Sequence, residues 1–382
     1  MLDTRSASDD IGSERLELPV ETTHIAKIAL SEHFILYTAV IGYVVACYAL
    51  IAYGYPEHQF SLLIYSEVTV TISVALLLLF AGTIALRIMV LERPRQLTKA
   101  IVEELKDVWF TKERLIQGAP LIVAFMFFIS CFSSMKSMIP VVQPYSWDTL
   151  LHQWDLALHA QTPPWRLTHA LFGGALATFL VNVGYNLWFP VMLGVFYWQI
   201  FTKRALVLRS RFLFSFFLCW IFNGTVLATF FSSAGPCFYG LLHPDAENPY
   251  APLMQSLATI NEQRPLWALS TQAQLWEAYQ SNTLGVGSGI SAMPSMHVSI
   301  AFLLFLFARH KHSVLAYSFG IFCTLTMVGS VHLGWHYAVD GYLSLITTCF
   351  IWKISGKVFA RHDRLPAPQQ TPIEAVLNQA YR

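Results

Sequence analysis

Three ionisable side chains lie where hydrophobic segments begin. His336 and Asp340 are four residues apart in the segment SVHLGWHYAVD (330–340), and His297 ends the segment PSMH (294–297). If residues 336–340 are helical, they share a face, so the carboxylate of Asp340 can reach the His336 ring and fix its tautomer. The other ring nitrogen is then free to attack phosphorus. The second histidine can give or take a proton near pH 7.

The elements that must position these residues are membrane helices. Only 12% of the 382 residues are charged, 55% are hydrophobic and the mean hydropathy is +0.49. A soluble chain of this length rarely has that balance. Crossing roughly 30 Å of hydrocarbon takes about 20 apolar residues. Eight segments approach or meet this length, the sixth being the shortest: 34–52, 68–90, 121–141, 175–200, 212–231, 294–307, 314–331 and 337–354.

The distribution of Lys and Arg supports eight crossings with both termini inside. With that topology, 21 of the 24 Lys and Arg fall in cytoplasmic segments, and only Lys136, Arg166 and Arg264 lie outside. Membrane proteins keep these residues on the cytoplasmic side. The same topology places His297, His332, His336 and Asp340 at the outer ends of helices, although they were not used to derive it. We therefore predict a multi-pass protein, in a bacterial inner membrane, with its site on the extracytoplasmic (periplasmic or lumenal) face.

Convergence at one membrane depth distinguishes these residues from isolated structural histidines. Asp340 is the strongest indication, because a carboxylate inside a membrane helix costs roughly 2.5 to 3.5 kcal/mol unless it faces a cavity or a partner. The helix starts at 294 and 337 also direct backbone N–H groups toward this layer, which suits a phosphate. Ser295 is a further candidate hydroxyl donor.

The predicted fold is an all-α, polytopic membrane bundle of about eight helices. Residues 1–32 form a cytoplasmic tail, and 33–118 form two membrane helices with a cytoplasmic amphipathic helix. Residues 119–357 form a six-helix catalytic core, and 358–382 a cytoplasmic C-terminal tail. The formal net charge of +1 gives no reason to expect a nucleic-acid partner. Five of the six cysteines fall within or beside apolar segments, so neither a disulfide framework nor a Cys-based metal site is predicted.

The polar segments on the outer side add two features. Trp147, Leu150, Leu151, Trp154 and Leu158 form an apolar stripe that predicts a helix lying in the interface. The opposite stripe carries Asp148, His152, Asp155 and His159. These four could hold a divalent metal, but a water-facing stripe shows the same periodicity, and we favour that interpretation. The long loop 235–292 contains enough Trp and Leu to pack on the protein.

These motifs resemble the phosphatidic acid phosphatase type 2 superfamily, and most closely its inositol phosphorylceramide synthase branch, related to sphingomyelin synthases. The resemblance covers about 121–357: Pro-Ser-Met-His297 and His336-x-x-x-Asp340 precede the fourth and sixth spans of that stretch. Gly235-Pro-Cys-Phe-Tyr239 and the segment 147–165 also resemble this branch. The resemblance implies that His336 is the nucleophile, forming a phosphohistidine, that Asp340 orients it, and that His297 protonates the leaving alcohol.

The sequence departs from the phosphatase motifs in its cations. Ser330 stands where the arginine of Ser-Arg-x5-His falls, and Arg87-x5-Arg93-Pro94 is one residue short of Lys-x6-Arg-Pro and on the predicted cytoplasmic side. Any charge clamp on phosphate must then draw on Lys136, Arg166, Arg264, helix ends or His332. Gly235 and Tyr239 are further candidates for substrate binding.

We predict an enzyme that moves a phosphate or phosphorylated headgroup from a phospholipid donor to a lipid or alcohol acceptor, with no metal and no cofactor. The acceptor pocket is expected from loop 235–292 and from Asn182 and Asn186. Two alternatives remain: a lipid phosphate phosphatase using the same residues, and a channel or transporter whose histidines relay protons or bind a ligand.

Overall fold

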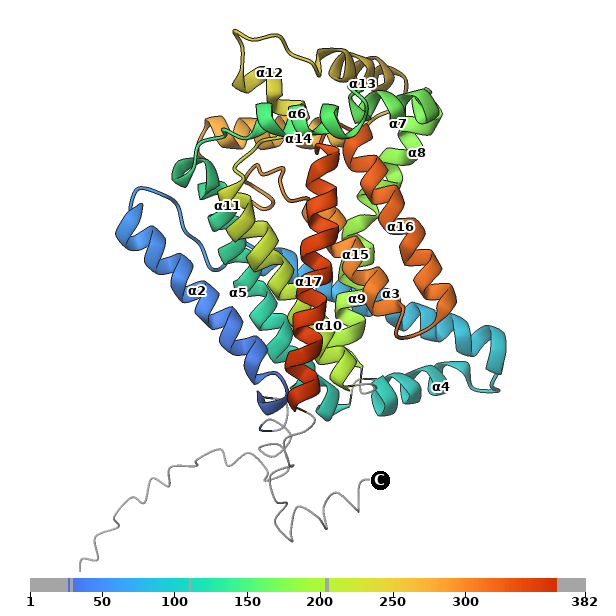
Figure 1. Ribbon diagram of the computed structural model, residues 1–382. Coiled ribbons are helices and arrows are strands. Elements are labelled where there is room, and N and C mark those ends of the chain that lie inside the picture. The colour runs from blue at the N-terminus through green and yellow to red at the C-terminus, as the bar shows by residue number, and fades with distance from the viewer. Residues whose placement is uncertain (1–26, 28–29, 110, 203–205, 363–382) are drawn as a thin grey trace, which may run out of the picture.

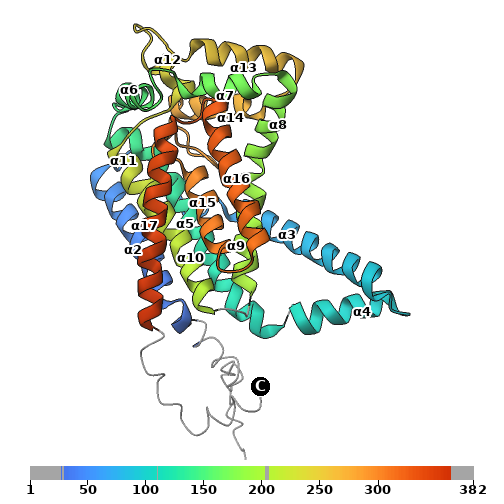
Figure 2. The same ribbon diagram turned by 45° about the vertical axis from the view of Figure 1, so that its right-hand side comes forward.

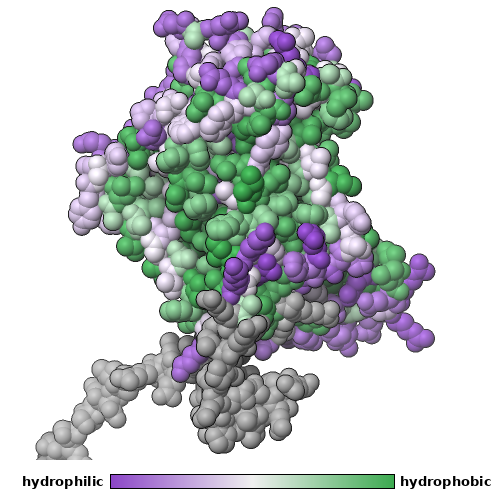
Figure 3. Space-filling model, viewed as in Figure 1, coloured by the Kyte–Doolittle hydropathy of each residue, from purple (hydrophilic) through white to green (hydrophobic). Residues whose placement is uncertain are grey.

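The computed structural model describes residues 27, 30–109, 111–202 and 206–362. Most of the predicted N-terminal tail and of the predicted C-terminal tail lies outside the described residues. Within them all regular structure is helical and no strand occurs, which confirms the all-α prediction. On the face shown in Figure 3, hydrophobic residues form a broad band between hydrophilic residues at the two ends of the bundle.

Seven of the described helices are long and apolar enough to cross a membrane. They are Phe34–Gly54 (α2), Ser66–Glu92 (α3 with the π-helical η1), Lys112–Val142 (α5), Ala175–Phe201 (α8 and α9), Leu206–Phe230 (α10, η3 and α11), Ser313–His332 (α16) and Ala338–Ala360 (most of α17, Ala338–His362). The sequence predicts these seven segments. Which end faces the cytoplasm stays a prediction.

The eighth predicted span is the short helix α15, Met296–Ala308, with 13 residues. A helix of this length extends about 20 Å, less than the hydrocarbon thickness. It lies in the middle of the bundle, where α10, α16 and α17 pack around it (Figure 1). Because protein surrounds α15, it places His297 in the interior without having to cross the bilayer itself.

Aromatic side chains fill the interior of the bundle. Phe196 stacks on Phe216 with ring centroids 4.6 Å apart, and Phe128 meets Phe217 edge to face at 4.9 Å. All four rings are fully buried. Such contacts add to the hydrophobic contribution of burying large rings.

A cap layer of short helices covers one end of the bundle (Figure 1). Its members are α6 (Asp148–Leu158), α7 (Pro164–Phe172), η4 (Pro236–Phe238), α12 (Tyr239–Leu242), α13 (Ala251–Gln263) and α14 (Trp267–Gln280). Four of these helices come from the long loop 235–292, and its Leu253, Leu257 and Leu266 are buried. The loop therefore packs on the protein, as its composition predicts.

The N-terminal helices form an arm at the side of the bundle. Helix α3 (Ser66–Arg87) slants away from the other helices, and α4 (Leu97–Glu103) leads back toward them (Figure 2). The predicted amphipathic helix is divided between α4 and a π-helical segment, η2 (Glu104–Trp109). Arg87 and Glu104, 3.0 Å apart, join the far end of α3 to η2.

Candidate active site

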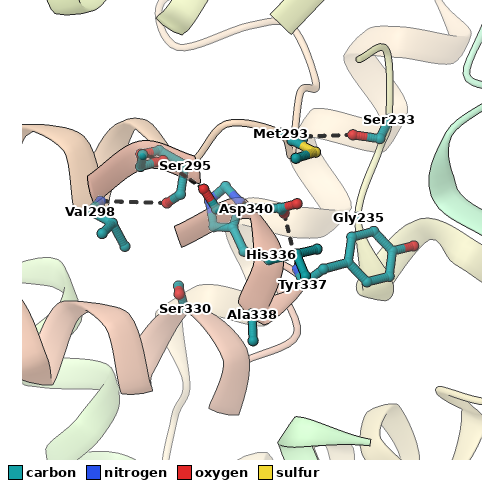
Figure 4. Close-up of polar contacts among 12 residues, drawn as sticks. Ser233, Gly235, Met293, Ser295, Val298, Ser330, His336, Tyr337, Ala338 and Asp340 are labelled. Carbon is teal, nitrogen blue, oxygen red and sulfur yellow. Dashed lines mark hydrogen bonds and ion pairs between the residues drawn. The ribbon is translucent and has the colours of Figure 1, made fainter. Parts of the chain in front are cut away.

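His336 and Asp340 are in contact. His336 Nδ1 lies 3.2 Å from Asp340 Oδ2, and the same oxygen accepts the backbone N–H of Tyr337 at 3.0 Å (Figure 4). Both side chains are buried. The contact orients the imidazole, and with the proton on Nδ1 the nitrogen that can react is Nε2.

The geometry of this pair differs from the predicted one. His336 is not part of a helix but lies in the connection between α16 and α17, two residues before Ala338. Asp340 sits in the first turn of α17 and reaches back across its start, as the acidic residue of a capping box does. The pair is thus formed at a helix N-terminus rather than along one helical face.

The ring of His336 is held neutral by its surroundings. Burial lowers the pKa of His336 to about 3; a hydrogen bond to the Ala292 carbonyl opposes this, and the nearby ammonium of Lys136 adds to it. A neutral imidazole is the form that can act as a nucleophile.

His297 occupies the first turn of α15 and faces the same region. Its ring centroid lies 6.3 Å from that of His336. The His297 ring stacks on Tyr185 at 4.7 Å and lies 4.3 Å from Trp188, whose indole N–H donates to the His297 carbonyl. Helices from distant parts of the sequence therefore bring the two histidines together, as predicted.

Both histidines line a cavity of about 540 Å³. Lys136 of α5 lines it as well and is the only Lys or Arg among the described residues of its wall. Most of the remaining wall is aromatic or aliphatic, with Phe132, Trp188 and Met192 as examples. An anionic group beside Lys136 would thus lie next to both histidines, at the top of an apolar space.

Ser295 and His332, two further candidate residues from the sequence, lie outside the cavity. Ser295 caps α15: its Oγ accepts the N–H of Val298, and its own N–H donates to the Asp340 carbonyl (Figure 4). His332 stacks on His169 at 4.1 Å and bonds to Thr178 Oγ1. Neither lines the cavity. Both instead connect helices that carry the site.

Gly235 and Tyr239 do not line the cavity either. Gly235 has φ +103°, and a Cβ there would lie 2.5 Å from the Trp335 carbonyl oxygen, so glycine is required for the close approach to the loop before His336. Tyr239 is buried in the cap layer against Tyr250. Of the two predicted acceptor residues, Asn186 lines the cavity and Asn182 does not.

Asp148 and Asp155 support the site, whereas the sequence predicts that they face solvent. Asp155 is buried and accepts the N–H groups of Ala338 and Val339, at 2.9 and 3.0 Å, at the start of α17. Asp148 is buried and accepts the N–H groups of Ala234 and Gly235. Burial raises the pKa of each, and these N–H groups lower it.

Asp148 also accepts the Tyr337 hydroxyl at 2.8 Å. Helix α6 therefore binds both the residue that follows His336 and the first residues of α17. We call Asp148, Asp155 and the segment 333–340, which joins α16 to α17 and includes the first turn of α17, the catalytic frame. The polar stripe of α6 faces the protein, whereas Leu150, Trp154 and Leu158 of the apolar stripe are exposed. The interpretation of the polar stripe as water-facing is therefore wrong, because buried helix N-termini need acceptors more than the α6 carboxylates need water.

His152 and His159 complete the polar stripe with hydrogen bonds to Tyr250 and Tyr342. In the part of the chain that the structure describes, no three His, Cys, Asp or Glu side chains come together as metal ligands. The stripe therefore acts through hydrogen bonds to the rest of the protein. In the sequence, the seven-residue spacing of Asp148 and Asp155 on an amphipathic helix is the pattern that could have indicated this supporting role.

Residues 149–354, just over half of the chain, match the PAP2 superfamily. The chain therefore belongs to the PAP2 superfamily, and on this basis it is a lipid phosphatase or phosphotransferase acting on lipid phosphates. Comparison with curated proteins and with solved structures gave no match. The matched region contains both histidines, Asp340 and Asp155, whereas Lys136 and α3 precede it.

Proposed function

We propose that the protein is a phosphotransferase, resembling inositol phosphorylceramide synthases, that moves a phosphorylated headgroup from a phospholipid to the hydroxyl of an acceptor lipid. The observation that carries this proposal is that His336 opens onto a largely apolar cavity whose described wall contains a single Lys or Arg, Lys136. A space of this kind favours lipid alcohols over water and strengthens the electrostatic interactions inside it.

In the first step, Nε2 of His336 attacks phosphorus while the bond from phosphorus to the leaving alcohol oxygen breaks. His297 gives its proton to that oxygen. The negative phosphate beside Lys136 favours the protonated form of His297 before this transfer. Asp340 holds the proton on Nδ1 and stabilises the positive charge that develops on the His336 ring.

In the second step, His297 accepts the proton of the acceptor hydroxyl. The acceptor oxygen attacks phosphorus and the nitrogen–phosphorus bond breaks, which restores neutral His336. Microscopic reversibility makes His297 the acid of one step and the base of the other. If water replaces the lipid alcohol, the phosphorylated headgroup is released instead, and for a phosphomonoester donor this is a phosphatase reaction.

The test uses purified protein with phosphatidylinositol as donor and ceramide or diacylglycerol as acceptor. New phospholipids are measured by mass spectrometry and released headgroup or phosphate in parallel. We expect a new phospholipid with wild-type protein and none with His336→Ala. Headgroup or phosphate release without a new lipid would overturn transfer in favour of hydrolysis, and turnover that survives His336→Ala would exclude the mechanism.

His310→Gln is the matched control, because it changes a histidine at the opposite end of α15 that bonds to the Leu306 carbonyl and does not line the cavity. We expect it to retain turnover after correction for the folded fraction. A rapid quench in alkaline SDS, with donor labelled in its phosphorylated headgroup, adds an independent measurement. Label should remain on wild-type protein in acid-labile form and be absent from His336→Ala.

A further inference from the structure

Helix α3 lies before the family match, yet it forms part of the cavity wall. Val68, Thr69 and Ile72 line the same space as His336, together with α5 and α9 (Trp188–Phe201). Beyond this stretch α3 leaves the bundle, and Leu78 and Leu79 are exposed. Figure 2 shows this slant away from the neighbouring helices. The contribution of α3 to the cavity is thus confined to its first turns.

Helices α5 and α9 meet at the end of the bundle opposite the site. A Cβ on Gly118 would lie 2.5 Å from the Phe201 ring, and Phe125 packs on Phe196 at 4.7 Å. Nearer the histidines the cavity separates the two helices. The floor of the cavity is therefore aromatic and closed.

Helix α3 bridges the separated parts of α5 and α9. At its start, the Tyr65 N–H donates to Ser130 Oγ of α5 at 3.2 Å. Two turns further along, Ser73 Oγ lies 2.6 Å from the Tyr197 hydroxyl of α9. The face of α3 between these two contacts carries Thr69, which is buried, and Ile72.

The depth of the cavity fits one leaflet. Lys136 and Phe125 line it from top to bottom and are eleven residues apart on α5. That separation corresponds to roughly 16 Å along a helix, about half of the ~30 Å hydrocarbon core. A lipid whose phosphate lies beside Lys136 would place an acyl chain along this length.

The mouth of the cavity opens toward the surface of the bundle. Phe189 of α9 and Val286 of the loop before α15 both line the cavity and are 55% and 54% exposed. Apolar residues exposed on the flank of a membrane bundle contact lipid. A chain can thus pass from the bilayer into the cavity without crossing water.

We propose that the first turns of α3 select the lipid substrate, by enclosing with α5 and α9 one acyl chain of the lipid whose phosphate reacts at His336. The catalytic half of this statement rests on the proposed function, but the acyl-chain site can be tested without turnover. Each methylene buried in the cavity contributes about 0.8 kcal/mol. Residues Val68, Thr69 and Ile72, which narrow the space, therefore set which chains bind.

The experiment compares Ile72→Trp, which fills the cavity, with Leu79→Trp on the lipid-facing part of the same helix. Leu79 is 66% exposed and does not line the cavity. Binding of dioleoyl and dioctanoyl phosphatidylinositol is measured by native mass spectrometry in the His336→Ala background, where turnover is blocked. Turnover of the same two lipids is measured in the wild-type background.

We expect Ile72→Trp to weaken binding and turnover of the dioleoyl lipid about tenfold and to leave the dioctanoyl lipid within about twofold. Leu79→Trp should change neither. Equal effects on both chain lengths, or the same effect from Leu79→Trp, would overturn the proposal. If Ile72→Trp is not monodisperse in detergent, Val68→Phe tests the same wall with a smaller change in volume.

The two proposals fail in different ways. Chain-dependent binding that responds to Ile72→Trp, without lipid turnover by wild-type protein, would keep the acyl-chain site and reject the proposed reaction. Turnover that depends on His336 but ignores chain length and Ile72→Trp would do the reverse.

Discussion

The catalytic frame and the α3 wall, by which we mean Val68, Thr69 and Ile72, border the same cavity but are held in place by different kinds of contact. In the frame, the carboxylates of Asp148, Asp155 and Asp340 are buried and each accepts backbone N–H groups. On α3, one side-chain pair, Ser73 with Tyr197, joins the helix to α9, and half of the helix residues are exposed.

The difference separates two requirements of the reaction. Attack on phosphorus requires the nucleophile and its partners to be fixed, because small displacements cost much of the rate. Recognition of an acyl chain depends on the shape of an apolar surface, which is not directional. A polar network suits the first requirement, and a lightly attached helix suits the second.

The largest expected effect is in the frame. Asp340→Asn keeps the volume but loses the charge that fixes the His336 tautomer, so kcat should fall by about 10³ to 10⁴. KM for the lipid should change little, because Asp340 does not line the cavity. Steady-state kinetics with one donor lipid would measure both. A kcat within tenfold of wild type would remove Asp340 from the mechanism.

The next effect concerns Asp155. Asp155→Ala leaves two buried N–H groups at the start of α17 without acceptors, so stability should fall by about 2 to 4 kcal/mol. Thermal unfolding in detergent would measure this loss. The kcat of the remaining folded protein should also fall, since α17 carries Asp340. Gln153→Ala, on the exposed side of α6, is the control and should change neither quantity.

A smaller effect is expected from pH. His336 has its pKa lowered to about 3 in the folded protein, whereas an unfolded histidine titrates near pH 6.5. The unfolded state therefore binds an extra proton between these values, so stability falls as pH drops from about 6.5 toward 3. His336→Gln removes this contribution, which is at most about 1.4 kcal/mol per pH unit.

The apparent melting temperature of both forms between pH 7 and 4.5 would test this prediction. Burial also lowers the pKa of His152 and His169, and these groups contribute equally to both proteins. The His336→Gln protein should lose less stability over this range. Identical pH dependence would show that His336 is not held neutral in the folded state.

The smallest effect lies on α3. Ser73→Ala removes two partly buried hydrogen bonds, one to the Thr69 carbonyl of its own helix and one to the Tyr197 hydroxyl of α9, each worth about 0.5 to 1.5 kcal/mol. Turnover of the dioctanoyl lipid should stay within about twofold of wild type. Thr83→Ala is the control, because Thr83 bonds only to its own helix through the Phe80 carbonyl. A large loss of turnover in Ser73→Ala alone would mean that α3 belongs with the catalytic frame.

The pairing of His336 with Asp340 and the presence of His297 nearby follow from sequence reasoning. A carboxylate and histidines at the ends of apolar segments have few low-energy positions other than a shared polar site. The same reasoning does not distinguish His332, because its stacking on His169 depends on how α7 packs against α16. Nor does it give the orientation of α6, since periodicity identifies two faces but not which one is buried.

The sequence by itself determined the membrane class and the seven long helices, and it indicated the candidate residues for a reaction with phosphate. Hydropathy and local spacing carry that information, because the bilayer requires long apolar helices and makes buried charge costly. Only the tertiary structure decided that His336 lies outside a helix, that Asp148 and Asp155 bind buried N–H groups, and that α3 closes the cavity. Those features arise from contacts between residues far apart in the chain, and local periodicity contains no record of such contacts.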